Sequence, residues 1–275
     1  MTSKSSKTLE SLENSRTNSL QNQSKELFLI FYITGYVKHD GLDDKMFHEA
    51  SQTRINNIKH AKNFNPEIHK VHSIPIQDLA EMRETILRYI NKYGGKNYAY
   101  TKEIGIFSHS GKEDGPIGSQ DTTQYKHLIY RDQMSLEGYT SIDFNWITNS
   151  TKRFIVYGCN SAYPSNPFIK KLSMHPNFRN VELWGQTTYS FPSFYPNKRS
   201  SSIIRQFWKS GFDIAEKGTS YTYMVGGNDG EGLEAIFTKT ANINPMAVYI
   251  NGKKTQEPYQ NKFNDHTIAD EIYLN

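Results

Sequence analysis

Residues 26–37 have the sequence ELFLIFYITGYV, in which an apolar run from Leu27 to Ile33 is followed by Gly35. A continuous run of aromatic and β-branched side chains, without alternating polar residues, is typical of a strand that is buried on both faces of a sheet. The run is far too short to cross a bilayer as a helix. This stretch therefore predicts the central strand of a sheet that is covered on both sides.

Further strands and helices are expected to alternate after this strand, and such alternation predicts an α/β domain with a mostly parallel sheet. We expect a strand over 69–76, a strand and then a turn within each of 103–111 and 153–162, and a strand within 180–186. We expect helices within 38–63, 76–95, 167–175 and 201–218. Residues from 219 onward mix short strands with loops and include the turn signal VYINGKK.

The composition indicates a globular protein without a disulfide framework. The chain has 275 residues, of which 36% are hydrophobic and 22% are charged, and its net charge at pH 7 is +4. That length suits one domain with a sizeable core. The positive charge is spread along the sequence, whereas nucleic-acid-binding domains gather it on one face, so no nucleic-acid partner is expected. The single cysteine, Cys159, excludes an intramolecular disulfide and a multi-cysteine zinc site.

The first 24 residues are rich in Ser, Asn, Gln, Lys and Glu and contain no apolar segment of the kind that a secretory signal has. We expect a disordered N-terminal arm over 1–24, with delivery or docking as its functional interpretation. One domain is expected over 25–275, with a mixed C-terminal extension from about residue 219. The expected location is the cytoplasm, or outside the cell after export by a route that uses no signal peptide, and no membrane span is predicted.

Two of the predicted strands end in residues that carry chemistry. The stretch GIFSHSG contains His109, and the stretch FIVYGCNSA contains Cys159. Catalytic groups of open α/β sheets collect at the carboxyl ends of the strands, so both side chains emerge at one edge if these strands are neighbours. An imidazole beside a thiol makes the nucleophilic thiolate available at neutral pH. The two stretches predict a His–Cys dyad, although each residue alone is also explained as a packed or satisfied side chain.

This arrangement resembles the caspase-like (clan CD) cysteine peptidases. In that clan, one apolar block ends in His-Gly, and about one β-α unit later another block ends in a small residue and Cys. Here His109 and Cys159 lie 50 residues apart, close to the ~50 residues that separate the two catalytic residues of caspases. The segment YGCNSA is most similar to the toxin-processing, clostripain and separase-type members. The resemblance covers roughly residues 25–195.

The resemblance implies a caspase-like three-layer sandwich and a cysteine endopeptidase that needs no cofactor or metal. His109 would be the general base or polarising group, and Cys159 would be the nucleophile. Backbone N–H groups near Ser110, Gly111 and Gly158 would hold the oxyanion. Ser110 departs from the pattern, because members of the clan have glycine directly after the histidine. Two alternatives stay open: an inactive caspase-like binding scaffold, and another hydrolase or transferase on a flavodoxin-like sheet with a structural cysteine.

The clan builds its P1 pocket from the loops after the first strand and after the cysteine strand, here TGYVKHDGLDD and LWGQTTYSFPS. The acidic residues of the first loop would favour Arg or Lys at P1, and the second loop would line a cleft. The alternatives are a solvated loop and a loop packed on the core. The candidate substrate-binding residues are Asp40, Asp43, Asp44, Gln186, Tyr189 and Ser190. A protein or peptide substrate is the expected partner, and a bacterial effector or toxin-like protease is the expected setting.

Overall fold

The computed structural model of the chain describes residues 24–35, 42–111, 113, 115–119, 134–187 and 246–257. The predicted N-terminal arm lies outside these residues except for Ser24, and so do the predicted helix over 201–218 and most of the predicted extension from residue 219.

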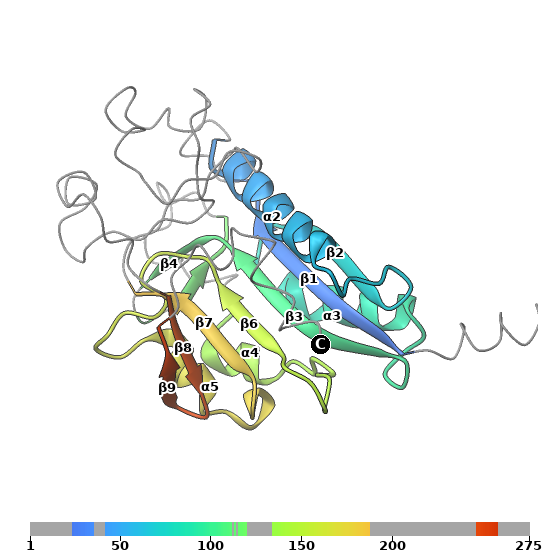
Figure 1. Ribbon diagram of the computed structural model, residues 1–275. Coiled ribbons are helices and arrows are strands. Elements are labelled where there is room, and N and C mark those ends of the chain that lie inside the picture. The colour runs from blue at the N-terminus through green and yellow to red at the C-terminus, as the bar shows by residue number, and fades with distance from the viewer. Residues whose placement is uncertain are drawn as a thin grey trace, which may run out of the picture.

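Seven strands of the described residues form one sheet (Figure 1). In spatial order they are β2 (His69–Ile76), β1 (Lys25–Ile33), β3 (Ala99–Phe107), β6 (Arg153–Val156), β7 (Glu182–Gln186), β8 (Met246–Ile250) and β9 (Lys253–Gln256). The first five are parallel, and β8 and β9 each pair antiparallel with the strand before them. The predicted α/β class and mostly parallel sheet are confirmed.

Strand β1 lies inside the sheet because both of its faces are apolar. Leu27 and Leu29 belong to the apolar cluster on one face of the sheet, and Phe28 and Ile30 belong to the cluster on the other. All four side chains are fully buried. The continuous apolar run therefore forms the doubly covered strand that its composition predicts.

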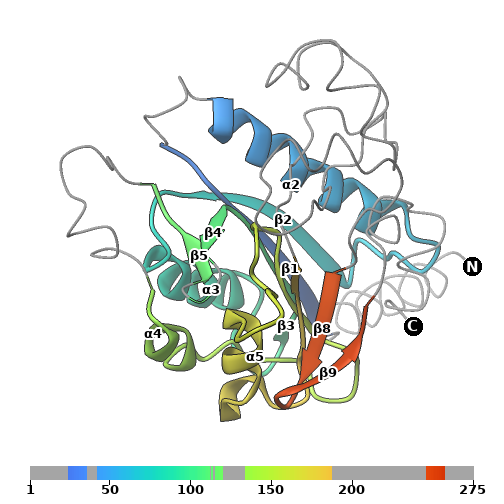
Figure 2. The same cartoon turned by 90° about the vertical axis from the view of Figure 1, so that its left-hand side faces the viewer.

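Helices cover both faces of the sheet (Figure 2). Helix α2 (Leu42–His60) packs on one face, where Phe47 and Ile58 join the cluster that contains Phe28. The opposite face carries α3 (Glu81–Lys92), α4 (Leu136–Thr140), α5 (Phe168–Ser173) and the 3-10 helix η3 (Pro176–Phe178). A separate hairpin of β4 (His109–Gly111) and β5 (Gly115–Ile117) follows the end of β3.

Helix α3 lies within 76–95, the range in which the sequence predicts a helix. A turn precedes it, because the side chain of Asp78 accepts a hydrogen bond from the backbone N–H of Ala80 at 2.5 Å. Gly94 and Gly95 follow the helix with φ angles of 108° and 83°. Glycine adopts this left-handed conformation without a steric penalty, so the pair ends the helix.

The predicted turn in VYINGKK forms a tight hairpin between β8 and β9. Asn251 and Gly252 have φ angles of 50° and 79°, and the flanking Ile250 and Lys253 are paired. Asn-Gly favours a two-residue turn in which both φ angles are positive, and such turns match the twist of the flanking strands. The prediction of a turn at this position is confirmed.

The inner side of α2 carries a buried ion pair in addition to its apolar side chains. The guanidinium of Arg54 donates to both carboxylate oxygens of Glu103 in β3, at 2.8 Å and 2.6 Å. Both side chains are fully buried. The two parallel hydrogen bonds offset part of the cost of removing both charges from water. This pair therefore fixes the position of α2 along β3.

His72 of strand β2 is enclosed by Tyr89 of α3 and by Tyr93, which directly follows that helix. Its ring centroid lies 4.5 Å from that of Tyr89 and 5.6 Å from that of Tyr93. Its Nε2 atom also lies 2.7 Å from the Tyr93 hydroxyl. Burial, followed by the positive charge of Lys92 and other lysines, lowers the pKa of His72 to about 4. The folded protein thus holds this imidazole neutral at mildly acidic pH.

Glu103→Leu is expected to destabilise the protein strongly, because the Arg54 guanidinium would stay buried without its counter-charge. The expected loss in the free energy of unfolding is about 3–5 kcal/mol. Glu257→Gln is the matched control, since it breaks the half-exposed pair of Lys254 and Glu257, which should contribute at most about 1 kcal/mol. Urea denaturation at pH 7 compares the two variants, and equal small losses would contradict the anchoring role of the buried pair.

The stability of the protein should also depend on His72 in acid. The unfolded chain protonates this imidazole near pH 6.5, and the folded protein does so only near pH 4. The unfolded state therefore binds more protons between these values, so the free energy of unfolding falls as the pH is lowered through this window. His72→Gln should flatten this dependence, because it removes the group that titrates differently in the two states. A His72→Gln profile parallel to that of the wild type would contradict the prediction.

Candidate functional site

The predicted dyad depends on whether the strands before His109 and Cys159 are neighbours, and they are. Strand β3 pairs with β6 in parallel, and Ile106 lies opposite Val156. His109 and Cys159 each follow three residues after this pair. Because parallel strands lie ~5 Å apart, an equal number of residues beyond the same register brings both to the same edge of the sheet.

Aromatic stacking holds these two strand ends in register. Phe107, two residues before His109, stacks on Tyr157, two residues before Cys159. The ring centroids are 4.1 Å apart and the ring planes are within 3° of parallel. The backbone N–H of Tyr157 also donates to the carbonyl of Ile106 at 2.9 Å. The alignment of the two strands thus continues beyond the end of β6.

The backbone segments that carry the two residues also touch directly at Gly158. A Cβ atom added to Gly158 would lie 2.4 Å from the Cβ of Ser110 and 3.0 Å from the carbonyl oxygen of Ser108. Real Cβ atoms do not approach other atoms this closely, so only glycine lets the two segments meet. The glycine before Cys159 therefore has a packing role that brings the cysteine turn against the residues around His109.

The turn after Cys159 is held by its own side chains and by β7. The hydroxyl of Ser161 donates to the carbonyl of Gly158 at 3.0 Å and accepts from the backbone N–H of Gln186 at 2.9 Å. The N–H of Ala162 donates to the carbonyl of Gln186 at 2.8 Å. Asn160 has a φ of 57°, a conformation that asparagine tolerates better than most residues. Cys159 lies at the start of this fixed turn.

His109 begins the hairpin of β4 and β5, which rests on α5. Gly115 has a φ of 79° and lies against Phe168, whose ring would be 2.6 Å from an added Cβ. Glu113, in the hairpin loop, lies 3.3 Å from Lys171 of α5. On its other side, the His109 imidazole meets the ring of Phe47 in α2 edge-to-face, at a centroid distance of 5.5 Å. Two elements from opposite faces of the sheet therefore support His109.

Two buried polar side chains flank the dyad in sequence. Ser108 precedes His109 and is 2% exposed, and Asn160 follows Cys159 and is 5% exposed. The Ser108 hydroxyl and the Asn160 side-chain carbonyl have no hydrogen-bond partner among the described residues. Leaving such an atom unsatisfied costs about 1–3 kcal/mol, and functional sites are one of the places where this cost is tolerated. Both atoms are enclosed by the protein, so they mark a polar interior next to the two residues.

Of the backbone groups that are predicted to hold an oxyanion, those of Ser110 and Gly158 lie close to each other beside Cys159. The nitrogen of Ser110 is 3.4 Å from the position of an added Cβ on Gly158. Gly111 follows one residue later in β4, opposite Gly115 of the hairpin. The structure thus brings Ser110 and Gly158 together, with Gly111 next to them in the chain.

Among the predicted substrate-binding residues, Asp44 lies at the same edge of the sheet. Its carboxylate accepts a hydrogen bond from the backbone N–H of Gly35 at 2.6 Å. Gly35 follows the carboxyl end of β1, so this bond joins the start of α2 to the strand next to β3. The carboxylate of Asp44 thus has a structural partner that the sequence does not reveal.

Of the other predicted substrate-binding residues, the structure describes the side chain of Gln186. Gln186 ends β7 and is fully buried. Its backbone supports the cysteine turn through Ser161 and Ala162. The predictions for Asp40, Tyr189 and Ser190, and for the side chain of Asp43 in the first turn of α2, fall outside the described residues.

A second imidazole lies at this edge and was missed in the sequence. The ring centroid of His48 in α2 is 5.0 Å from that of Tyr32, near the end of β1. His48 and Phe47 lie in a helix and not after a strand, so their positions in the sequence gave no sign that they lie near the dyad. The helical register that brings these residues to the strand ends depends on the Arg54–Glu103 pair, which sequence spacing does not show.

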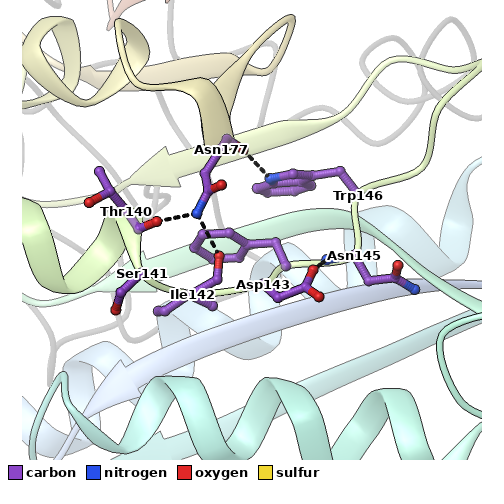
Figure 3. A pocket seen from close by; sticks show the side chains of 8 residues that line it. Thr140, Ser141, Ile142, Asp143, Asn145, Trp146 and Asn177 are labelled. Carbon is purple, nitrogen blue, oxygen red and sulfur yellow. Dashed lines mark hydrogen bonds between the residues drawn. The ribbon is translucent and has the colours of Figure 1, made fainter.

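A polar pocket of about 400 Å³ lies at the opposite edge of the sheet (Figure 3). Trp146 in this pocket bridges to Thr101 at the start of β3. The Asn177 amide donates to the carbonyls of Thr140 and Ile142, and the Trp146 indole N–H donates to the Asn177 carbonyl. These polar groups tie the segment before β6 to η3, so the pocket has a structural explanation and is remote from the dyad.

Within the described ranges, no group of three or more His, Cys, Asp or Glu side chains is arranged to hold a metal ion. No helix in the same part of the chain has the length and apolar character needed to cross a membrane. No protein-family model, curated protein or solved structure matched the chain.

Gly158→Ala is expected to push the two strand ends apart, because its methyl group would overlap Ser110 and the Ser108 carbonyl. Overpacking of this kind costs about 1–3 kcal/mol. Ser110→Gly removes the closest overlapping atom, so the double variant should recover part of the lost stability. A double-mutant cycle by urea denaturation measures this coupling. Strictly additive losses would show that Ser110 and Gly158 do not contact each other.

Proposed function

We propose that this chain is a cysteine endopeptidase in which Cys159 is the nucleophile and His109 is the general base. The observation that carries the proposal is the register of β3 and β6, which delivers both residues to one edge. The Gly158 contact and the Phe107–Tyr157 stack support it, because they keep the two segments together.

The proposed reaction follows the usual steps of a thiol peptidase. The His109 imidazole takes the thiol proton of Cys159, and the thiolate attacks the carbonyl carbon of the scissile peptide bond. The C–N bond then breaks as the imidazolium returns its proton to the leaving amine, which leaves a thioester on Cys159. Water, activated by His109, hydrolyses the thioester to release the carboxylic acid and restore the thiol.

The backbone around the dyad supplies hydrogen-bond donors for this reaction. The N–H groups of Ser110 and Cys159 are the candidates to hold the oxyanion, with that of Gly111 as the further candidate. Backbone donors that are fixed before the reaction stabilise the developing charge without reorganising. The turn held by Ser161 and the hairpin braced on α5 fit this requirement, because both restrict the backbone next to the dyad.

We propose a caspase-like fold for this domain, on the strength of the motif resemblance together with the parallel sheet between helical layers. A basic P1 residue is the proposed preference, from Asp44 at the sheet edge and Asp40 and Asp43 near it in sequence. A role as a bacterial effector or toxin-like protease, in the cytoplasm or exported without a signal peptide, is part of the same proposal.

One structural feature favours the second candidate, an inactive caspase-like scaffold. Ser110 stands where the clan has glycine, and its side chain packs against Gly158 beside the cysteine turn. The strand order favours the third candidate, another hydrolase or transferase. The parallel strands, taken along the chain, lie in the order second, first, third, fourth, fifth, which is the flavodoxin-like order. In that candidate, Cys159 is structural.

The dyad predicts a reactive thiol. The rate of Cys159 alkylation by iodoacetamide should show an apparent pKa well below the free-thiol value of about 8.5. His109→Ala should return it toward that value, since the variant removes the nearby imidazole. His48→Ala is the matched control, because it removes the other imidazole at this edge and should leave the profile unchanged.

Peptide cleavage separates the three candidates. A peptide library with Arg or Lys among its P1 residues should be cleaved by the wild type, and Cys159→Ala should lower the rate by at least ~1000-fold. Retained activity in Cys159→Ala would favour the hydrolase with a structural cysteine. A folded wild type without activity and with an unshifted thiol would favour the binding scaffold.

A further inference from the structure

We propose that Phe47 is a positioning residue for the His109 imidazole, and that helix α2 thereby sets the geometry of the dyad. The inference rests on the proposed function, because it concerns the base of that reaction. Phe47 contains no group that takes part in proton transfer, and its proposed role acts entirely through His109.

The contact between the two rings has a defined geometry. The planes of Phe47 and His109 meet at 84°, with their centroids 5.5 Å apart. Phe47 is 2% exposed, whereas His109 is exposed at the edge of the sheet. A buried ring against an exposed one limits the rotation of the exposed ring, because edge-to-face pairs are attractive only in a narrow range of orientations. The phenyl ring restricts the imidazole without hydrogen bonding to its nitrogens.

Phe47 is itself held in place relative to the strand that carries His109. Arg54, two helical turns further along α2, makes the buried ion pair with Glu103 of β3. At the start of the helix, the carboxylate of Asp44 accepts the N–H of Gly35 after β1. These two attachments lie on either side of Phe47 in sequence and bind α2 to neighbouring strands. The contacts that run from Glu103 of β3 through Arg54 and Phe47 therefore reach His109, which follows the end of β3.

Through these contacts, Phe47 supports the imidazole from the face of the sheet that lies opposite to α5. The hairpin that begins at His109 is braced by Phe168 and Lys171 on one face, and Phe47 approaches from the other. A general base must keep its nitrogen within hydrogen-bonding reach of the thiol, and small displacements reduce catalysis by large factors. The loss of the phenyl ring should therefore weaken the thiol–imidazole coupling even though both reacting groups remain.

The experiment measures the pH dependence of Cys159 alkylation in Phe47→Leu, Phe47→Ala and Ile55→Ala. Phe47→Leu keeps an apolar side chain and so protects the fold, while it removes the ring contact. Ile55→Ala is the control, because Ile55 is 4% exposed in the same cluster but lies ~12 Å further along the helix axis. His109→Ala supplies the reference profile for a thiol without its base, and thermal unfolding shows that each variant is folded.

We expect Phe47→Leu to raise the apparent pKa of the thiol by about one unit, which is a ~10-fold decrease in its ionisation constant. Phe47→Ala should shift it further, and Ile55→Ala should leave it unchanged despite a similar loss of thermal stability. If His109→Ala shifts the profile and neither Phe47 variant does, the positioning role is wrong while the dyad stands. Equal shifts in Ile55→Ala and Phe47→Leu would also overturn it. If His109→Ala shifts nothing, the dyad fails and this inference fails with it.

Discussion

The parallel pairing of β3 with β6 is the constraint on which the functional account depends. These strands are separated along the chain by the hairpin and by α4, and nothing local joins their ends. The ladder from Glu103–Arg153 to Ile106–Val156 aligns them. A shift of the register by one residue would turn the side chains of β6 to the opposite faces of the sheet. Cys159 would then lose its place beside the residues around His109.

Several independent contacts keep that register. Apolar side chains cover both faces of β3 and β6, so each side chain of these strands must point to one particular face of the sheet. The stacked rings of Phe107 and Tyr157 and the close approach at Gly158 extend the alignment past the last paired residues. The site is thus built from turns at the ends of rigid strands, which is where α/β sheets place their chemistry. The buried ion pair of Arg54 and Glu103 attaches helix α2 to strand β3.

Much of the fold follows from local patterns in the sequence. The apolar run of β1, the strand at 69–76 and the Asn-Gly turn each carry a signal within a few residues, and the structure confirms all three. Boundaries were less predictable. The strand expected within 103–111 begins earlier, at Ala99, because pairing with β1 extends it backward, and the hairpin that begins at His109 stands where the turn is predicted.

The two residues of the candidate dyad could be predicted from the sequence, whereas the contacts that hold them in place could not. His109 and Cys159 stand out because each follows an apolar strand, and strand ends are visible in sequence. The roles of Phe47 in orienting His109 and of Asp44 in binding Gly35 were not predictable, since they depend on how α2 lies across the sheet. The packing role of Gly158 was equally hidden, because it depends on Ser110, which lies 48 residues earlier in the chain.

The adjacency of Cys159 and His109 is tested most directly by a short bifunctional alkylating reagent such as 1,3-dibromoacetone. The thiol displaces bromide from one end of the reagent, and a second nucleophile within reach of the three-carbon bridge displaces bromide from the other end. The account predicts an intramolecular bridge between Cys159 and His109, identified by mass spectrometry of the linked peptides and absent in His109→Ala. A bridge to His48 instead, or Cys159 alkylated without any bridge in the folded protein, would contradict the account.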